Sequence, residues 1–126
     1  MAQVNLAGFG YNESEEVTGN KTLDGGDSGV AQNVTATCTV TLPAAAAGTS
    51  GVTYPIRVGA ENITVTISPN SADKIVGNGF TAADDKDMIF TNQPVGSYVV
   101  LQAVNEATTD SAYVVQRILG TATRQA

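Results

Sequence analysis

After Asn33, apolar residues and threonine alternate without a break through residues 34–42. The apolar positions are Val34, Ala36, Cys38, Val40 and Leu42, and threonine occupies every position between them. Successive side chains of a β-strand point to opposite faces of a sheet, so this period of two predicts a strand with one buried and one solvated face. Pro43 is expected to end the strand, because proline has no N–H group to donate to a continuing ladder.

The same period recurs later in the chain. Residues 52–58 and 63–68 alternate in the same way, and shorter apolar segments follow at 75–76, 88–90, 98–104 and 113–119. Pro55 lies on the opposite parity from Tyr54 and Ile56, which favours an edge strand or a β-bulge there. The pattern predicts an all-β fold, an antiparallel β-sandwich or barrel of about seven short strands.

Composition divides the chain into three parts, and its length of 126 residues suits one domain. Residues 1–32 carry six glycines among polar and acidic residues, so an extended, loop-rich N-terminal arm is expected there. Residues 33–120 hold the alternating runs and are expected to form the β-sandwich or barrel domain. Residues 121–126 are expected to be a polar C-terminal tail.

The chain is acidic, with 12 Asp and Glu residues against 6 Lys and Arg residues and a net charge of −6 at pH 7. Nucleic-acid binding draws most of its affinity from clustered basic side chains, so neither a nucleic acid nor an anionic membrane is expected as a partner. The start of the chain lacks the basic residues and the apolar run of a secretion signal. Synthesis in a cytoplasm is therefore expected.

Histidine, the commonest general base near neutral pH, is absent from the sequence. Residues 26–29, Gly-Asp-Ser-Gly, resemble the surroundings of the nucleophilic serine in trypsin-like proteases, but Ser28 has no histidine to accept its proton. A turn is expected instead. The single cysteine, Cys38, lies on the apolar parity of its strand and is expected to be buried, with no intrachain disulfide.

Carboxylates gather at two places in the sequence. They are Glu13, Glu15 and Glu16 near the start and Asp84, Asp85 and Asp87 in the second half. A glycosidase or a calcium site needs such groups, but neither cluster has the spacing of an EF-hand loop, and Lys86 interrupts the second. Solvated acidic loops are favoured, and the sequence predicts no catalytic residue, no metal site, no cofactor and no enzyme activity.

Four segments resemble a pattern that is frequent in virion proteins of tailed phages. They are TVTLPAAAAG at residues 39–48, YPIRV at 54–58, ITVTISP at 63–69 and DKIVGNG at 73–79. The phage pattern runs "tVTLPaaaaG", a strand, "ItItp" and then "aDxIxGxg", and it is found in head decoration (cement) proteins and in tail-fibre or tail-tip modules. After Ala83 the chain departs from it, since a tryptophan is expected near the last strands and this sequence has none.

The resemblance implies a non-enzymatic structural protein of the virion, a decoration protein on the outer capsid surface. Such a protein bridges and stabilises major capsid protein subunits and is commonly a homotrimer. The N-terminal arm is then expected to order on docking, with Leu6, Phe9 and Tyr11 as apolar contacts to the capsid or another partner.

Two alternatives remain open from the sequence. One is a tail-fibre or tail-tip domain that binds a host receptor, and the other is a carbohydrate-binding module. Sugar sites stack their ligands on exposed aromatic rings, whereas Tyr54 and Tyr98 fall at expected core positions and tryptophan is absent. The decoration protein is therefore the favoured interpretation.

Overall fold

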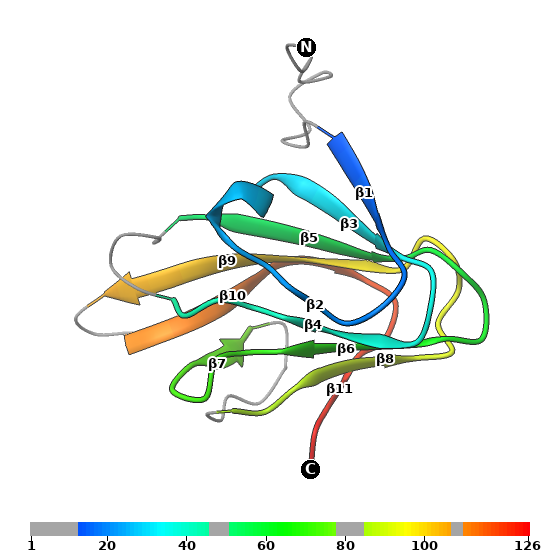
Figure 1. Ribbon diagram of the computed structural model, residues 1–126. Helices are drawn as coiled ribbons and strands as arrows, with labels where there is room; N and C mark the ends of the chain where they lie inside the picture. The colour runs from blue at the N-terminus through cyan, green and yellow to red at the C-terminus, as the bar shows by residue number, and fades with distance from the viewer. Residues whose placement is uncertain (1–12, 46–50, 78–84, 107–109) are drawn as a thin grey trace.

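The computed structural model describes residues 13–45, 51–77, 85–106 and 110–126 (Figure 1). Within these ranges there is no α-helix, and the single helical turn is the 3-10 helix η2 at Gly25–Asp27. No helix there is long and apolar enough to cross a membrane. The described strands are β1 (Glu13–Val17), β2 (Lys21–Thr22), β3 (Val30–Val34), β4 (Cys38–Thr41), β5 (Thr53–Val58), β6 (Thr64–Ser68), β7 (Lys74–Val76), β8 (Met88–Thr91), β9 (Tyr98–Glu106), β10 (Asp110–Leu119) and β11 (Thr123–Arg124).

These strands form two mixed sheets. Sheet A has the order β1-β3-β5-β9-β10-β7, and sheet B has the order β11-β8-β6-β4-β2. From β1 to β6 the chain passes to the other sheet after every strand. As a result, β1, β3 and β5 are parallel neighbours in sheet A, and β2, β4 and β6 are parallel neighbours in sheet B.

The two sheets share one hydrophobic core, which is built from the side chains that alternate inward along each strand. Val40 and Ile67 come from sheet B and Ile56 and Leu101 from sheet A, and none of the four is more than 2% exposed. Full burial of an aliphatic side chain of this size stabilises a fold by about 1.5–3 kcal/mol. The aliphatic core is therefore the main source of stability.

Two buried tyrosines tie sheet A to the segments that follow strands of sheet B. The rings of Tyr54 and Tyr113 lie 6.0 Å apart between centroids. The Tyr54 hydroxyl donates to the carbonyl of Asp24, after β2, at 3.1 Å, and the Tyr113 hydroxyl donates to the carbonyl of Pro43, after β4, at 2.7 Å. Desolvation by burial raises the pKa of both hydroxyls above the ordinary value of 10.0.

The predicted alternation is confirmed, but residues 33–42 form parts of two strands. Val34 ends β3 in sheet A, the chain bends at residues 36–37, and β4 starts at Cys38 in sheet B. The alternation continues on both sides of the bend because Val34 of β3 and Val40 of β4 both point into the shared core. Cys38 is buried as expected, at 7% exposure, and desolvation raises the pKa of its thiol.

The structure corrects the expected pairing. The eleven strands in the described ranges make nine pairings, and five of the nine are parallel. The short links after β3 and β5 would suit hairpins, but each carries the chain across the core into the other sheet. Parallel neighbours need a long connection, and the intervening strand of the opposite sheet supplies it.

Residues 13–32 also differ from the extended arm that composition predicts. They contain β1, β2 and most of β3, and Val17 and Leu23 are core residues with 3% and 1% exposure. Sparse apolar residues suffice there because each short strand needs only one inward side chain. The expected C-terminal tail also contributes a strand, since β11 pairs with β8 at the edge of sheet B.

Pro55 lies in a central strand, contrary to the expected edge or bulge. β5 has β3 on one side and β9 on the other. The registered pairs with β3 begin one residue later, where Ile56 opposes Gln32. The proline therefore lies before that ladder starts, where an N–H group is not needed.

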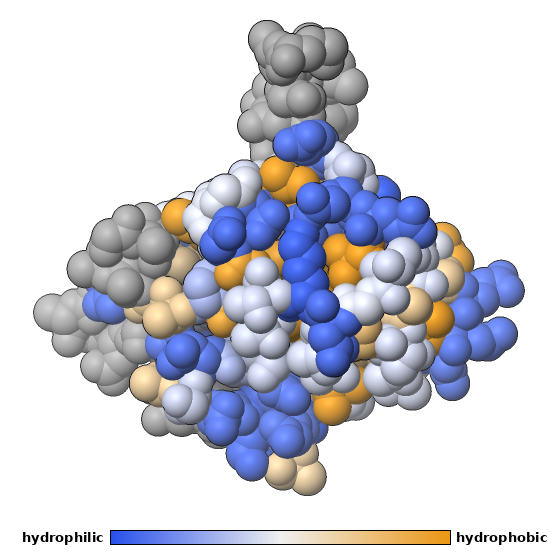
Figure 2. Space-filling view, in the orientation of Figure 1, coloured by the Kyte–Doolittle hydropathy of each residue, from blue (hydrophilic) through white to orange (hydrophobic). Residues whose placement is uncertain are grey.

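Lys21 ties the two sheets together along one side. It lies in β2 at the edge of sheet B and bonds to Glu15 of β1 at the edge of sheet A. Its Nζ also donates to Oε1 of the fully buried Gln32 at 2.9 Å and lies 3.5 Å from Asp27. Figure 2 shows hydrophilic residues running between β1 and β2 on this side, with hydrophobic residues beside them.

Candidate binding face on sheet A

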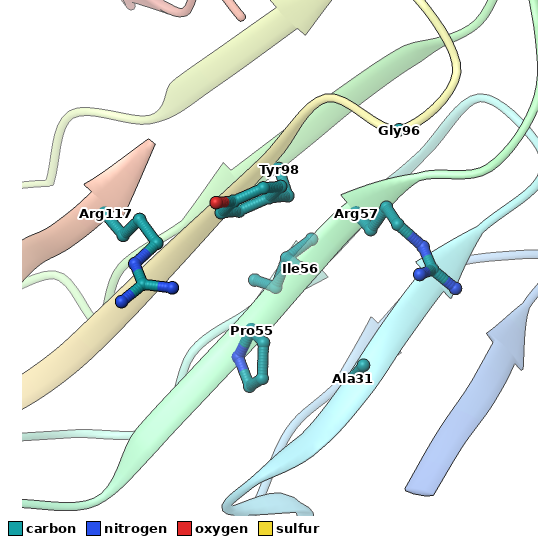
Figure 3. Close-up of a pocket in the computed structure, with 7 residues that line it drawn as sticks. All are labelled: Ala31, Pro55, Ile56, Arg57, Gly96, Tyr98 and Arg117. Atoms are coloured by element: carbon teal, nitrogen blue, oxygen red, sulfur yellow. The ribbon is translucent and has the colours of Figure 1, made fainter. Parts of the chain in front are cut away.

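A hollow of about 320 Å³ opens on the face of sheet A that points away from the core (Figure 3). We refer to it as the sheet A hollow. It is lined by residues of β3, β5, β9, β10 and the loop before β9, namely Ala31, Pro55, Ile56, Arg57, Gly96, Tyr98 and Arg117.

Strand alternation places the lining side chains of β5 outward, except for Ile56. Along β5, Tyr54, Ile56 and Val58 are buried in the core, so Pro55 and Arg57 point to the outer face.

Two cross-strand rows build the hollow. In the first row, Arg57 of β5 opposes Tyr98 of β9. In the second row, Pro55 of β5 opposes Val100 of β9, which in turn opposes Arg117 of β10. The rows are adjacent on one face, so the two arginines lie diagonally across β9.

Arg57 is oriented by its neighbour in β3. Its Nε donates to Oδ1 of Asn33 at 2.9 Å, and the two residues are opposite each other in the parallel ladder. The Asn33 amide packs against Gly59, where an added Cβ would lie only 2.5 Å from Asn33 Oδ1. Gly59 therefore leaves room for the amide that holds Arg57 in place.

Arg117 reaches the outer face because of a β-bulge. The ladder with β9 shifts between Val115 and Arg117, and Gln116 is the extra residue. Val115 packs against the core. Strict alternation from Val115 would turn Arg117 inward, whereas the bulge sets it opposite the outward Val100.

Tyr98 lies on this face and not in the core, contrary to the sequence prediction. It is partly exposed, and in Figure 3 its ring lies across β9 with the hydroxyl end toward Arg117. Tyr54 is fully buried as predicted. The two tyrosines differ because Tyr98 opposes the outward Arg57 in the ladder.

Charge and apolar surface meet at the sheet A hollow. Within the described ranges neither Arg57 nor Arg117 forms an ion pair with a carboxylate, whereas Lys21 pairs with two. The large exposed hydrophobic side chains in those ranges are Val95 and Leu119, at 56% and 57% exposure. Val95 precedes the lining residue Gly96, and Leu119 opposes Tyr98. This combination suits a ligand with both an anionic and an apolar part.

The other sequence candidates do not join this site. Leu6, Phe9 and Tyr11 lie outside the described residues. Ser28 follows η2, and its Oγ accepts a hydrogen bond from the Thr53 N–H at 3.3 Å, consistent with the predicted turn.

The acidic candidates lie elsewhere. The three glutamates are exposed on β1, where Glu15 bonds to Lys21 and Glu16 accepts from the Thr35 hydroxyl at 2.9 Å. Asp84 lies outside the described residues, and Asp85 is exposed. No group of three or more His, Cys, Asp or Glu side chains in the described part of the chain is placed to hold a metal ion.

Sequence reasoning missed both arginines of the sheet A hollow. Arg57 could have been found, because the alternation that buries Tyr54 and Ile56 also sends Pro55 and Arg57 outward. Arg117 could not, because its direction depends on a bulge that the alternation does not reveal. Comparison with protein-family models, curated proteins and solved structures gave no match.

Proposed function

We propose that the chain is a non-enzymatic virion structural protein of the capsid decoration (cement) type. It binds the outer capsid surface of a phage and bridges and stabilises major capsid protein subunits. The observation that carries the proposal is the outer face of sheet A, where Leu119 and two arginines that no carboxylate in the described ranges pairs with lie at the hollow, and exposed Val95 precedes the lining residue Gly96. The phage-like segments within residues 39–79 support the same class.

In this proposal the two sheets are the layers of a β-sandwich that serves as a rigid support. A homotrimer would set three copies of the binding face around one axis. Leu6, Phe9 and Tyr11 add contacts to the capsid or to another subunit. A protein that binds the assembled shell in preference to free subunits stabilises the shell by mass action.

The test uses expanded phage capsids that lack a decoration protein. The purified chain is expected to co-sediment with them stoichiometrically and to raise their disruption temperature. The double variant Val95→Asn, Leu119→Asn is expected to bind much less well, because it removes exposed apolar contacts. The matched control Thr123→Asn, on β11 of sheet B, is expected to bind normally. If the unmodified chain does not bind at all, the proposal is wrong.

A carbohydrate-binding role, in a tail-fibre domain or a separate module, is the second candidate. One observation favours it: Tyr98 is partly exposed and lines the hollow, where its ring offers a stacking surface for a sugar. A glycan array probed with the chain and with Tyr98→Ala separates the two proposals. Glycan binding that Tyr98→Ala abolishes, without capsid binding, would favour this candidate.

A further inference from the structure

We infer that the sheet A hollow docks an acidic polypeptide segment, in which glutamate or aspartate side chains pair with Arg57 and Arg117 and an adjacent apolar side chain covers Tyr98 and Leu119. The inference deepens the proposed function, on which the segment belongs to the capsid protein. The site itself is a property of the isolated chain and can be tested without a capsid.

The charge distribution is the first argument. The chain carries twice as many acidic as basic residues, yet no carboxylate in the described ranges pairs with either arginine of the hollow. By contrast, Lys21 on the edge strand β2 pairs with the carboxylates of Glu15 and Asp27. The Arg117 guanidinium, and the N–H groups of Arg57 that the bond to Asn33 does not use, are therefore left for an external acceptor.

The spacing of the arginines is the second argument. β9 separates β5 from β10, so the two strands that carry Arg57 and Arg117 lie about 9.5 Å apart, or two strand spacings. Figure 3 shows the two side chains on opposite sides of Tyr98. Asn33 holds Arg57 toward β3, away from β10, so two acidic side chains of one segment, one at each planar guanidinium, fit this spacing.

The apolar surroundings decide which kind of anion fits. Tyr98 and Val100 of β9 lie between the strands that carry the arginines, and Leu119 lies beside Tyr98 in its row. A nucleic acid needs a row of cations along its phosphates, whereas the lining of the hollow contains two. An acidic side chain flanked by leucine or a similar residue satisfies both the guanidiniums and the apolar surface.

A second copy of this chain fits the site less well than another polypeptide. The exposed acidic edge, β1, already uses Glu15 in the bond to Lys21 and Glu16 in the bond to Thr35.

The experiment measures the binding of a fluorescein-labelled probe peptide, Ac-Gly-Leu-Glu-Asp-Leu-Gly-NH2, by fluorescence anisotropy at low and high salt. Its amide twin, with Gln and Asn in place of Glu and Asp, tests the carboxylates. The full chain is compared with Arg57→Gln, Arg117→Gln and the double variant. Arg124→Gln on β11 removes the same charge outside the hollow and is the matched control.

The acidic peptide is expected to bind at least tenfold more tightly than its amide twin, with an advantage that shrinks at high salt. Each single variant is expected to weaken binding about fivefold, as for one partly exposed charged hydrogen bond, while Arg124→Gln changes it less than twofold. Equal binding of the two peptides, or equal losses at Arg57, Arg117 and Arg124, overturns the inference. So does self-association of the chain that Arg57→Gln and Arg117→Gln abolish, since the occupant is then a second copy.

The capsid assay separates this inference from the proposed function. Normal capsid binding by the double arginine variant would overturn the acidic segment and leave the decoration proposal standing. Peptide binding with no capsid binding would overturn the decoration proposal and leave the acidic-segment site standing.

Discussion

Sheets A and B cover the same core but present opposite kinds of surface to solvent. The outward positions of sheet B are mostly hydroxyl side chains set opposite one another, in the pairs Thr22 with Thr41, Thr41 with Ser68, Thr39 with Thr66 and Thr64 with Thr91. Sheet A instead sets outward a proline, a tyrosine and two arginines around a hollow. The regular alternation in sheet B gives a uniform outer face of hydroxyl groups. In sheet A, a proline in β5 and a bulge in β10 give an outer face with several kinds of side chain.

The contrast extends to how the sheets are joined. Sheet B contributes aliphatic side chains, together with Phe90 and Met88, to the core. Sheet A contributes both buried tyrosines, and each hydroxyl bonds to a carbonyl beyond the sheet. Sheet A therefore holds the polar ties across the core as well as the candidate binding face.

Alkaline pH is expected to have the largest effect on stability. Desolvation raises the pKa of Tyr54 and Tyr113 above 10.0, so the folded state favours their protonated forms. Their contribution is complete below pH 10 and is lost as the pH rises above it, by up to about 1.4 kcal/mol per pH unit for each tyrosine. Urea unfolding between pH 8 and 12 measures the loss.

Tyr113→Phe sharpens this result. The variant removes one titrating group and the hydrogen bond to Pro43. Its free energy of unfolding is therefore expected to be about 1 kcal/mol lower at pH 8 and to fall less steeply above pH 10. An unchanged slope would show that Tyr113 does not contribute to alkaline unfolding.

Gly120→Ala, at the end of sheet A, is expected to lower the free energy of unfolding by about 2–3 kcal/mol. Gly120 has a φ of +101°, and an added Cβ would lie 2.9 Å from the Cβ and Oγ of Ser97. Gly96→Ala, at a φ of +99° with no atom within 4 Å, carries the backbone strain alone and is expected to cost about 1 kcal/mol. Chemical unfolding of both variants measures the difference, and equal losses would remove the steric argument at Ser97.

Gly59→Ala is expected to separate binding from stability. The atoms that its Cβ would meet belong to the end of the Asn33 side chain, which can move, so the free energy of unfolding should fall by less than about 1 kcal/mol. Movement of Asn33 releases Arg57, and binding of the acidic probe peptide should weaken about twofold to fivefold. Gly19→Ala, with nothing within 4 Å of the new Cβ, is the control that should change neither quantity.

Exchanging valine and threonine on the outer faces of the two sheets is expected to have the smallest effects on stability and on peptide binding. Thr66→Val on sheet B should change stability by less than about 0.5 kcal/mol and leave peptide binding unaltered. Val100→Thr on sheet A should be equally mild for stability but should weaken peptide binding about twofold, because Val100 lies between Pro55 and Arg117. If Thr66→Val also weakens binding, the contrast between the faces is wrong.

The sequence predicted the buried side of each strand better than the position of the strand. The parity of Val40, Ile56 and Ile67 is correct because burial in a sheet follows a period of two. That period is the same in parallel and antiparallel ladders, so it could not show that Val34 and Cys38 belong to different sheets. The candidate site depended on a bulge and on cross-strand register, which are set by tertiary pairing.

The passage of the chain between sheets from β1 to β6 has a consequence for biosynthesis. Each ladder in this half joins segments far apart along the chain: Glu13 opposes Val30, and Cys38 opposes Val65. A strand leaving the ribosome must wait for another strand and two links before its own partner appears, and contacts of such long sequence separation form slowly. In this half of the protein, each strand therefore pairs within its own sheet only after a strand of the other sheet has been made.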